Sequence, residues 1–504
     1  MTTSLSHLEL EPIIISMHVS LSGIVLGVLF GLIFCAGLDG FSAPAEAPAP
    51  SASTGRQFCA GAAASNITPR LGISINGYFN DRQATHIHDE LHARCLVLDD
   101  GQTRLAIVVC DSCMIPREVL DKAKRRIEEQ YQLPAGHILI SSTHTHTAPT
   151  STAIFQSEPD APYLELLVGR IADGVGRAIH NLEPARIAWG VGREPNQVFN
   201  RRWKMKPGRI PATPLGGTHD QVKMNPPMES PDLIEPVGPT DPEVSVVSLQ
   251  SPSGRPIALL ANYSLHYVGT GRDNEISADY YGAFADRIQQ LLGADRQDPP
   301  FVAMLSNGTS ADINNINFRK KHPPQPPYEQ MRLVADAVAT EAQRVCGTLQ
   351  YQDWVPLQVG QTELKLGVRL PAPDEVARAE AILAKAQGQP LKTAEQAFAR
   401  ETVLLKDYPR EMPLIIQAMR IGELGIAAIP GEVFVETGLA IKRQSPFKPT
   451  FTIELANGCS GYIPTPEQHK LGGYETWPAR SSFLETGAAP KIQAALMSLF
   501  QQLR

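Results

Sequence analysis

The amino-acid sequence predicts an α/β fold, in which one large domain over residues 57–504 has a mixed β-sheet covered by helices. Two observations predict this class. Short apolar, β-branched runs alternate with segments of helical periodicity, a pattern typical of βαβ units. Two neighbouring apolar runs are joined by a turn sequence, which adds antiparallel strands. The composition, with 43% hydrophobic and 19% charged residues, excludes disorder as the main state.

The first part of the domain is predicted to form a βαβ unit. Leu105 to Val109 is an apolar, β-branched run, Arg117 to Tyr131 has helical periodicity, and Ile138 to Ile140 is apolar again. These segments predict a strand, a crossover helix and a second, parallel strand. A helix over Pro162 to Leu182 and a strand over Ala185 to Val191 are expected next.

A hairpin and further helices follow. Val244 to Leu249 and Pro256 to Tyr263 flank Ser251-Pro252-Ser253-Gly254, whose residue types favour a turn between antiparallel strands. The later elements are expected as a helix over Tyr280 to Leu292, a strand over Phe301 to Leu305, a helix from about Gln330 to Arg344, and a strand over Ile426 to Ile429.

Two segments depart from this pattern. Lys204 to Pro242 is rich in proline with little periodicity, which predicts a long loop that is either functional or disordered. Residues 373–407 are rich in Ala, Glu, Lys and Leu, and predict a helical excursion on the surface.

The N-terminus indicates where the protein is located. Ile13 to Leu38 is apolar and almost uncharged, so residues 1–41 are predicted to be a signal peptide or an N-terminal membrane anchor. Residues 42–56 are rich in Ala and Pro and are predicted to be a linker. We therefore expect an extracytoplasmic protein that is secreted, periplasmic or membrane-anchored.

Charge and cysteine content exclude two classes of protein. The formal charge is −7, from 45 basic and 52 acidic residues, so the cationic surface that nucleic acid requires is not expected. Seven cysteines in 504 residues are too few for a disulfide scaffold. Cys110 and Cys113 are spaced like a metal-binding pair, but a second pair is lacking, and we interpret them as structural.

The strongest local signal is the run from Ser141 to Pro149, which contains His144 and His146 directly after the second predicted strand. Ligand sites in open α/β sheets lie beyond the carboxyl ends of strands. Two histidines at this spacing can bind one metal together, or one can be a ligand and the other a proton carrier. The alternative is a polar loop in which both imidazoles bind backbone groups.

Four more polar segments are candidates. His266 follows an apolar strand, residues 306–315 hold small and hydrogen-bonding side chains after another, Glu432 comes near a helix start, and Tyr462 and Tyr474 lie in a loop rich in Gly and Pro. Each has an ordinary structural explanation: a hydrogen-bonded histidine, a turn, a carboxylate favouring a helix dipole, and surface tyrosines. Because most of these segments directly follow apolar strands, their joint pattern indicates one metal site with separate proton carriers.

In order along the chain, these motifs resemble the N-terminal domain of the neutral/alkaline (non-lysosomal) ceramidases, a family of zinc amidases. The matching segments are Asn66-Ile67-Thr68-Pro69, Gly77-Tyr78, His88-Asp89-Glu90-Leu91-His92-Ala93-Arg94, Thr143-His144-Thr145-His146, Leu265-His266, Pro430-Gly431-Glu432, and Gly461-Tyr462 with Thr465-Pro466-Glu467. The resemblance covers most of residues 57–504 and implies a zinc hydrolase domain there.

The resemblance also implies a role for each candidate residue. The implied Zn²⁺ ligands are His144, His266, Glu432 and Tyr462. It places His146 beside the metal-bound water, Tyr474 as a second active-site tyrosine, and Arg201 as a group that helps to hold substrate. These roles are chemically reasonable, since neutral imidazoles and a carboxylate keep zinc acidic enough to activate water, while His146 can transfer a proton. Tyr474 and Arg201 can then stabilise an oxyanion.

Two departures from the family concern the substrate. Ala311-Asp312-Ile313-Asn314-Asn315 resembles the family's Gly-Asp-Val-Ser-Pro-Asn, which implies substrate-binding roles for Asp312 and Asn314. Asn314 stands where the family has serine, so a role that depends on serine does not transfer. The chain ends at Arg504, soon after the tyrosine loop, so we expect the C-terminal β-sandwich domain of the full ceramidases to be missing.

These observations predict an exported, zinc-dependent hydrolase that cleaves an amide, with an N-acyl sphingosine as the leading substrate. The expected partners are an amide-bearing small molecule or lipid, and a membrane through the N-terminal segment, with no nucleic acid. One alternative is a related metal-dependent hydrolase of a different amide or ester. The other is a non-catalytic zinc-binding scaffold of the same fold.

Overall fold

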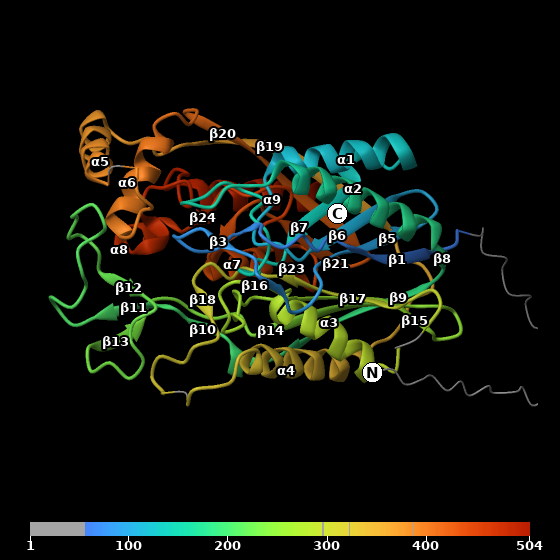
Figure 1. The fold of residues 1–504 in the computed structure, drawn as a ribbon. Coiled ribbons are helices and arrows are strands. Elements are labelled where there is room, and N and C mark those ends of the chain that lie inside the picture. The colour runs from blue at the N-terminus through green and yellow to red at the C-terminus, as the bar shows by residue number, and fades with distance from the viewer. Residues whose placement is uncertain (1–55, 295–296, 322, 387) are drawn as a thin grey trace, which may run out of the picture. The chain divides into compact units, whose positions relative to one another are not determined.

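The core of the protein is built from stacked β-sheets with helices on the outside, as Figure 1 shows. A computed structural model describes residues 56–294, 297–321, 323–386 and 388–504. Residues Thr54–Arg504 form one compact unit. The predicted signal or anchor over residues 1–41, and the predicted linker as far as Gly55, lie outside the described residues. Among the residues that are described, no helix has the length and apolar character needed to cross a membrane.

The first sheet contains five strands in the order β7-β6-β5-β1-β8. Strands β6 and β7 are parallel, and the other neighbours are antiparallel. Helix α1 makes the crossover between β6 and β7. Its buried residues form an apolar stripe along one face of the helix. The bounds are β1 Cys59–Asn66, β5 His92–Asp99, β6 Arg104–Cys110, α1 Arg117–Tyr131, β7 Ile138–Ser142, α2 Ala161–His180 and β8 Glu183–Pro184.

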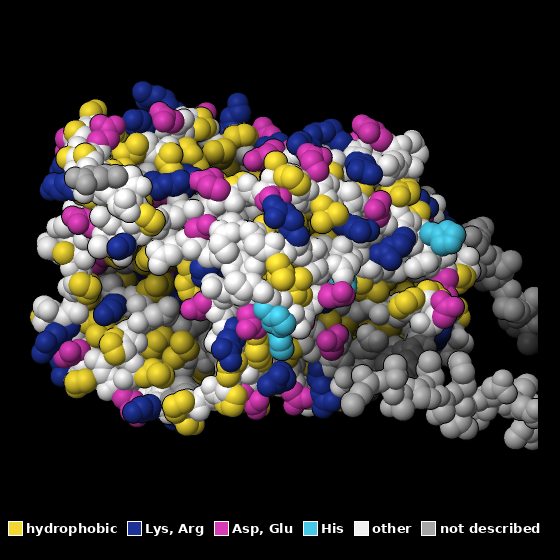
Figure 2. Space-filling view, in the orientation of Figure 1, with side chains coloured by type: hydrophobic (Ala, Val, Ile, Leu, Met, Phe, Trp, Pro, Cys, Tyr) yellow, Lys and Arg dark blue, Asp and Glu magenta, His cyan; other side chains and the backbone are white. Residues whose placement is uncertain are grey.

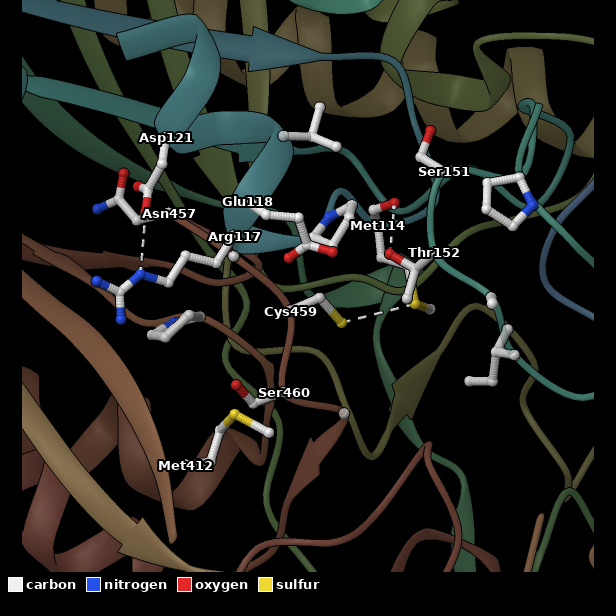
Figure 3. Close-up of a pocket in the computed structure, with 18 of the residues that line it drawn as sticks. Met114, Arg117, Glu118, Asp121, Ser151, Thr152, Met412, Asn457, Cys459 and Ser460 are labelled. Atoms are coloured by element: carbon white, nitrogen blue, oxygen red, sulfur yellow. Dashed lines mark hydrogen bonds and ion pairs between the residues drawn. The ribbon is translucent and has the colours of Figure 1, made fainter. Parts of the chain in front are cut away.

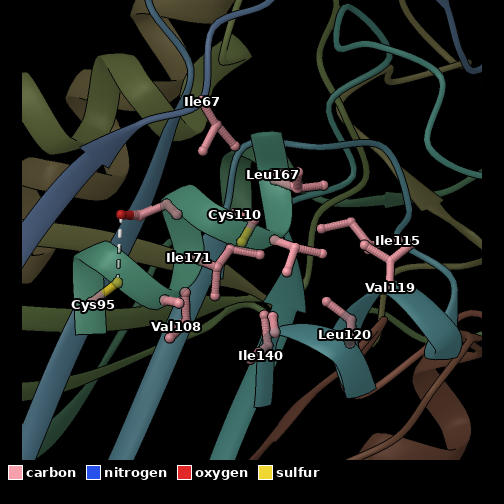
Figure 4. Packing of buried hydrophobic residues seen from close by; sticks show 14 of the residues in the cluster. Ile67, Cys95, Val108, Cys110, Ile115, Val119, Leu120, Ile140, Leu167 and Ile171 are labelled. Carbon is pink, nitrogen blue, oxygen red and sulfur yellow. Dashed lines mark hydrogen bonds between the residues drawn. The ribbon is translucent and has the colours of Figure 1, made fainter. Parts of the chain in front are cut away.

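Alternate residues of this sheet contact two different cores. Val108, Cys110 and Ile140 pack under α1 and α2, where they meet Leu120 and Ile171 (Figure 4). The residues that point to the opposite face pack against a second sheet, which makes both faces of the strands apolar.

The second sheet has the order β17-β15-β14-β9. Strands β14 and β15 form the expected antiparallel hairpin, and β15 pairs in parallel with β17. Helices α3 and α4 cover its outer face, and the sheet's other face joins the core shared with the first sheet. The bounds are β9 Arg186–Arg193, β14 Glu243–Gln250, β15 Pro256–Tyr263, α3 Asp279–Leu291, β17 Val302–Asn307 and α4 Glu329–Cys346.

A third sheet, in the order β19-β20-β21-β23, extends the fold, and helix α9 packs on it. The bounds are β19 Leu357–Gly367, β20 Glu411–Ile421, β21 Leu424–Ala428, α7 Val435–Gln444, β23 Thr450–Ile453 and α9 Ala488–Gln502. Short elements complete the described structure: β2 Ser74–Ile75, β3 Arg82–Gln83, β4 His86–Ile87, η1 Ala135–His137, η2 Pro195–Gln197, β10 Phe199–Asn200, β16 Glu275–Ile276, β18 Ile313–Asn314, β22 Glu432–Val433, β24 Tyr462–Ile463, α8 Pro466–Leu471 and η3 Tyr474–Thr476.

The predicted α/β class is confirmed, with helices covering mixed sheets, but the strands are divided among several sheets rather than one. The reason is that apolar runs buried on both faces can be covered by a second sheet as well as by helices. The predicted helices and strands before residue 350 lie where expected.

The structure corrects two details. Lys204 to Pro242 is not without regular structure, because β11 Arg202–Met205, β12 Val222–Met224 and β13 Leu233–Pro236 form a small sheet. Strands this short show no periodicity in the sequence. The predicted surface excursion contains α5 Pro373–Lys385 and α6 Ala394–Leu405, and α6 is not purely superficial, since its Phe398 is buried.

Charged side chains of both signs are interspersed over the face of the molecule drawn in Figure 2. This distribution fits the small net charge of the chain.

Candidate metal centre

The candidate side chains come from loops at the carboxyl ends of strands in all three sheets. His144 follows β7, His266 follows β15, and Glu432 lies beyond β21. Strand β22, which begins at Glu432, pairs in parallel with β24, so that Glu432 lies opposite Tyr462. The topology thus brings together residues that are more than three hundred positions apart in the chain.

Three of the four predicted metal ligands converge closely. The Nε2 atoms of His144 and His266 are 3.1 Å apart. One carboxylate oxygen of Glu432, Oε2, lies 3.3 Å from Nε2 of His144 and 4.0 Å from Nε2 of His266. All three side chains are almost completely buried.

Hydrogen bonds from Nδ1 to backbone carbonyls fix the orientation of both imidazoles. The Nδ1–H of His144 donates to the carbonyl of Cys113 at 2.9 Å, and the Nδ1–H of His266 donates to the carbonyl of Ser310 at 3.2 Å. In its neutral form, each imidazole then presents the lone pair of Nε2 to the other ring. His144 has a φ of 75°, a strained backbone conformation that is typical of functional sites.

This donor set fits a metal ion. Two imidazole lone pairs cannot hydrogen-bond to each other, and the Oε2 atom of Glu432 is buried without a hydrogen-bond partner among the described residues. A cation satisfies all three donors at once, and two histidines with one carboxylate are a common zinc-ligand set. His144, His266 and Glu432 are also one of two groups in the described structure whose donor atoms lie within 4.8 Å of one another.

The buried charges shift the pKa values of the three histidines in different directions. Burial would lower the pKa of His144, but the carboxylate of Glu432 and the thiol of Cys113 outweigh it and raise the pKa well above its usual value. Burial, together with the charge of Arg201, lowers the pKa of His266, and burial with the charge of His144 lowers the pKa of His146. His266 and His146 are thus neutral, as a ligand and a proton acceptor must be, whereas His144 would release a proton on binding a cation.

His146 lies beside the converging donors. Its Nε2 atom is 3.2 Å from Nε2 of His144, and its ring stacks on Tyr267 at 3.6 Å between centroids. Gly77 also packs closely against the ring, because a Cβ atom there would lie 2.5 Å from the imidazole. Gly77 also has a φ of 105°, so two independent reasons require glycine.

Tyr462, Tyr474 and Arg201 form the adjoining wall. Arg201 donates from Nη2 to the hydroxyl of Tyr462 at 3.2 Å, and the rings of Tyr462 and Tyr474 are 5.7 Å apart in an edge arrangement. Arg201 is buried, and its Nε atom donates to Glu475 at 3.0 Å. The second carboxylate oxygen of Glu475 accepts from Arg202 at 2.5 Å.

The two predicted substrate-binding residues, Asp312 and Asn314, form hydrogen bonds with other protein groups. The carboxylate of Asp312 accepts from the backbone of Val435 at 2.9 Å and from Asn200 at 2.8 Å. Asn314 donates from its amide to Asn225 at 2.7 Å. These contacts hold the segment next to Arg201, whose N–H donates to the carbonyl of Asp312. Direct contact of either residue with a substrate stays a prediction.

Sequence reasoning missed two buried carboxylates of this site. Glu475 neutralises two arginines, and its place directly after Tyr474 was the available signal. Glu454 follows β23 and accepts from the hydroxyl of Ser310 and the backbone of Val433, both at 2.7 Å. It thereby connects the segments that carry His266 and Glu432. Burial raises the pKa of Glu454 to about 8.

Glu432 also lines a cavity of about 990 Å³, part of whose wall Figure 3 shows. Its wall combines apolar side chains with charged ones near α1, including Arg117, Glu118 and Asp121. Other lining residues are Met114, Thr152, Ile154, Leu164, Val168, Leu404, Tyr408, Met412, Cys459, Ser460 and Phe483.

Comparison with known proteins places the chain in a family. The family described as neutral/alkaline non-lysosomal ceramidase, N-terminal, matches residues 58–320, which is more than half of the chain. The chain belongs to this ceramidase family. The match contains the segments that carry His144, His146, Arg201, His266 and Asp312.

Individual relatives are more distant. The neutral ceramidase of Pseudomonas aeruginosa is 23% identical over 85% of this chain and 68% of its own length. Neutral ceramidase 1 of Arabidopsis thaliana is 28% identical, but the match covers 29% of this chain and 21% of that protein.

Solved structures share the fold. The crystal structure of neutral ceramidase from Pseudomonas aeruginosa superposes with a TM-score of 0.68 at 18% identity, covering 89% of this chain and 75% of the other. A structure described as ceramidase complexed with C2 has the same TM-score at 19% identity, covering 89% and 76%. At these identities the likeness concerns the fold alone.

Proposed function

We propose that this ceramidase-family protein is a zinc-dependent amidohydrolase that cleaves an N-acyl lipid amide of the ceramide type. One observation carries the proposal. Two imidazole lone pairs and an unpartnered carboxylate oxygen converge in a buried site next to His146. Family membership and the printed activity of the relatives support the amide bond as the target.

We assign His144, His266, Glu432 and Tyr462 as the residues that would hold zinc. Tyr462 lies opposite Glu432 because β24 pairs in parallel with β22. When bound, zinc supplies a Lewis acid that polarises a carbonyl and lowers the pKa of water. The contacts from Cys113 and Ser310 hold the two imidazoles in place before any ion arrives.

His146 is the proposed general base. Burial lowers its pKa, so the ring is neutral and can accept a proton from an attacking water. The same ring can return the proton to the leaving amine. Its stack on Tyr267 and the close contact of Gly77 fix the direction of Nε2.

Arg201 and Tyr474 are the proposed stabilisers of the oxyanion that forms when the amide carbonyl is attacked. Arg201 carries a buried positive charge, and Glu475 holds it in position. Burial raises the pKa of Tyr474, so its hydroxyl stays protonated and can donate. Asp312 and Asn314 are proposed to position this wall and the adjoining part of the substrate.

A panel assay tests the proposal. Zinc-loaded protein is incubated with ceramides and with short N-acyl amides and esters, with and without a chelator. We expect chelator-sensitive release of fatty acid from an N-acyl amide, and a loss of at least 100-fold in kcat for His146→Ala. His219→Ala is the matched control, since this imidazole is largely exposed.

The outcome separates the alternatives. Turnover of esters or other amides without ceramide favours a related metal-dependent hydrolase, an alternative motivated by Asn314 in the place of the family serine. Bound zinc without turnover of any substrate favours a scaffold and refutes the enzyme.

We also propose that the chain is exported, with residues 1–41 serving as a signal peptide or an anchor. The measurement is cell fractionation combined with mass spectrometry of the mature N-terminus. Intact protein found only in the cytoplasm would contradict export.

A further inference from the structure

The cavity next to the candidate metal centre has a sulfur-rich floor. Met114 and Cys459 both line it, and the Sγ atom of Cys459 lies 3.6 Å from the Sδ atom of Met114, as Figure 3 shows. Cys113 and Leu455 pack with these two residues in one small cluster. Cys459 is partly exposed, whereas Cys113 and Met114 are buried. The cluster therefore offers two thiols and one thioether, with one thiol within reach of the cavity.

The spacing of the two sulfur atoms suits a shared ion. Two metal–sulfur bonds of about 2.3 Å at a tetrahedral angle put their sulfur atoms about 3.8 Å apart. The measured separation is 3.6 Å, so both atoms can bind one ion with little movement. Cys113 lies on the inner side of the cluster, where its Sγ atom is 3.8 Å from Nδ1 of His144. This sulfur lies within 4.8 Å of the ligand atoms of His144 and His146, on the side of the candidate metal centre.

We propose that Cys459 and Met114, with Cys113 packed against them, form a binding site for a soft monovalent cation, Cu⁺ or Ag⁺, which is separate from the zinc centre. Thiolate and thioether sulfur select soft cations, whereas imidazole and carboxylate donors such as His266 and Glu432 suit zinc. The cavity supplies the route for the ion, and Glu118 adds an acidic group to its wall. The inference does not depend on amide hydrolysis.

The chemistry of Cys459 favours metal binding over alkylation. Burial raises the pKa of the Cys459 thiol, so little thiolate is present at neutral pH. A soft cation displaces the thiol proton as the metal–sulfur bond forms, and that proton is released to the solvent. No oxidant or reductant is required.

The test measures bound metal rather than turnover. Zinc-loaded full-length protein is titrated with Cu⁺ under anaerobic conditions against a chromogenic Cu⁺ chelator, and with Ag⁺ in parallel. Zinc, copper and silver are then counted after desalting. We expect one tightly bound Cu⁺ or Ag⁺ with zinc retained, and X-ray absorption that shows sulfur ligands.

Variants locate the site. Met114→Leu keeps the side-chain volume and removes the thioether, and Cys459→Ser removes the accessible thiol; each is expected to weaken Cu⁺ binding at least tenfold. Cys346→Ser is the matched control, because Cys346 is also partly exposed but belongs to another core cluster. If Cys459→Ser does not fold, Met114→Leu alone decides the test.

Three results would overturn the proposal. The first is a wild type that retains no Cu⁺ or Ag⁺. The second is displacement of zinc in a one-to-one ratio, which would put the ion at His144 and His266. The third is unchanged binding in Met114→Leu, or a loss in Cys346→Ser as large as the loss in Cys459→Ser. Failure of the hydrolase proposal shows only in the separate turnover assay, so the two proposals fail independently.

Discussion

Replacing Glu475 by glutamine tests the buried charge network behind the candidate active site. The carboxylate is fully buried and bridges Arg201 at 3.0 Å and Arg202 at 2.5 Å. Burial alone would raise the pKa of Glu475, but the two guanidinium groups outweigh it and hold the pKa below its usual value. The carboxylate is therefore ionised and compensates two buried positive charges.

Glu475→Gln keeps the shape and removes the charge, which leaves both arginines without an ionic partner. Breaking a buried ion pair on one side costs about 3–5 kcal/mol of unfolding free energy. Urea denaturation measures this loss. Because Arg201 also donates to the hydroxyl of Tyr462, we expect kcat for the proposed amide substrate to fall as well.

Glu329→Gln is the matched control, since Glu329 and its partner Arg332 are both exposed on the surface of α4. Exposed ion pairs contribute about 0–1 kcal/mol to the free energy of unfolding. A loss below 1 kcal/mol for Glu475→Gln, or an equal loss in both variants, would refute the view that the buried carboxylate stabilises this wall.

Three further predictions test other parts of the structure. Gly77→Ala should abolish hydrolysis, because the added Cβ would displace His146. Gly72 also has a positive φ but no atom within 4 Å, so Gly72→Ala should keep activity and lose only about 1–2 kcal/mol of stability through backbone strain. Equal activities in the two variants would contradict the clash. Glu454→Gln should weaken zinc binding by about 10-fold in a chelator competition, because it disturbs the segments that hold His266 and Glu432, and unchanged affinity would exclude this role. Burial, with the charges of Arg369 and Arg202, lowers the pKa of His469 to about 4, so the unfolded chain takes up its proton first and stability is lost as pH falls from about 6.5 to 4. Discounted for partial exposure, the loss should be about 1–2 kcal/mol, and denaturation curves at pH 7 and pH 4.5 should show a smaller difference in His469→Gln than in the wild type.

Much of the fold could be predicted from the local pattern of the chain. The βαβ unit over Arg104 to Ser142 and the hairpin of β14 and β15 follow from periodicity and turn residues alone. The short strands between Lys204 and Pro242 could not be predicted, since three or four residues carry no period. The division into stacked sheets could not be predicted either, because an apolar run does not specify whether a helix or another sheet will cover it.

The sequence by itself determined the candidate residues of the site, since His144, His146, His266 and Glu432 each follow a predicted strand and match a family motif. It also determined the family resemblance that the comparisons later confirmed.

Only the tertiary structure decided which groups support those residues. Glu454, Glu475 and the sulfur pair of Met114 and Cys459 act across contacts between distant segments, and the last two residues are 345 positions apart. Such contacts depend on how the sheets stack and where their carboxyl ends meet. Periodicity reports only which face of an element is buried, so no local pattern carries this information.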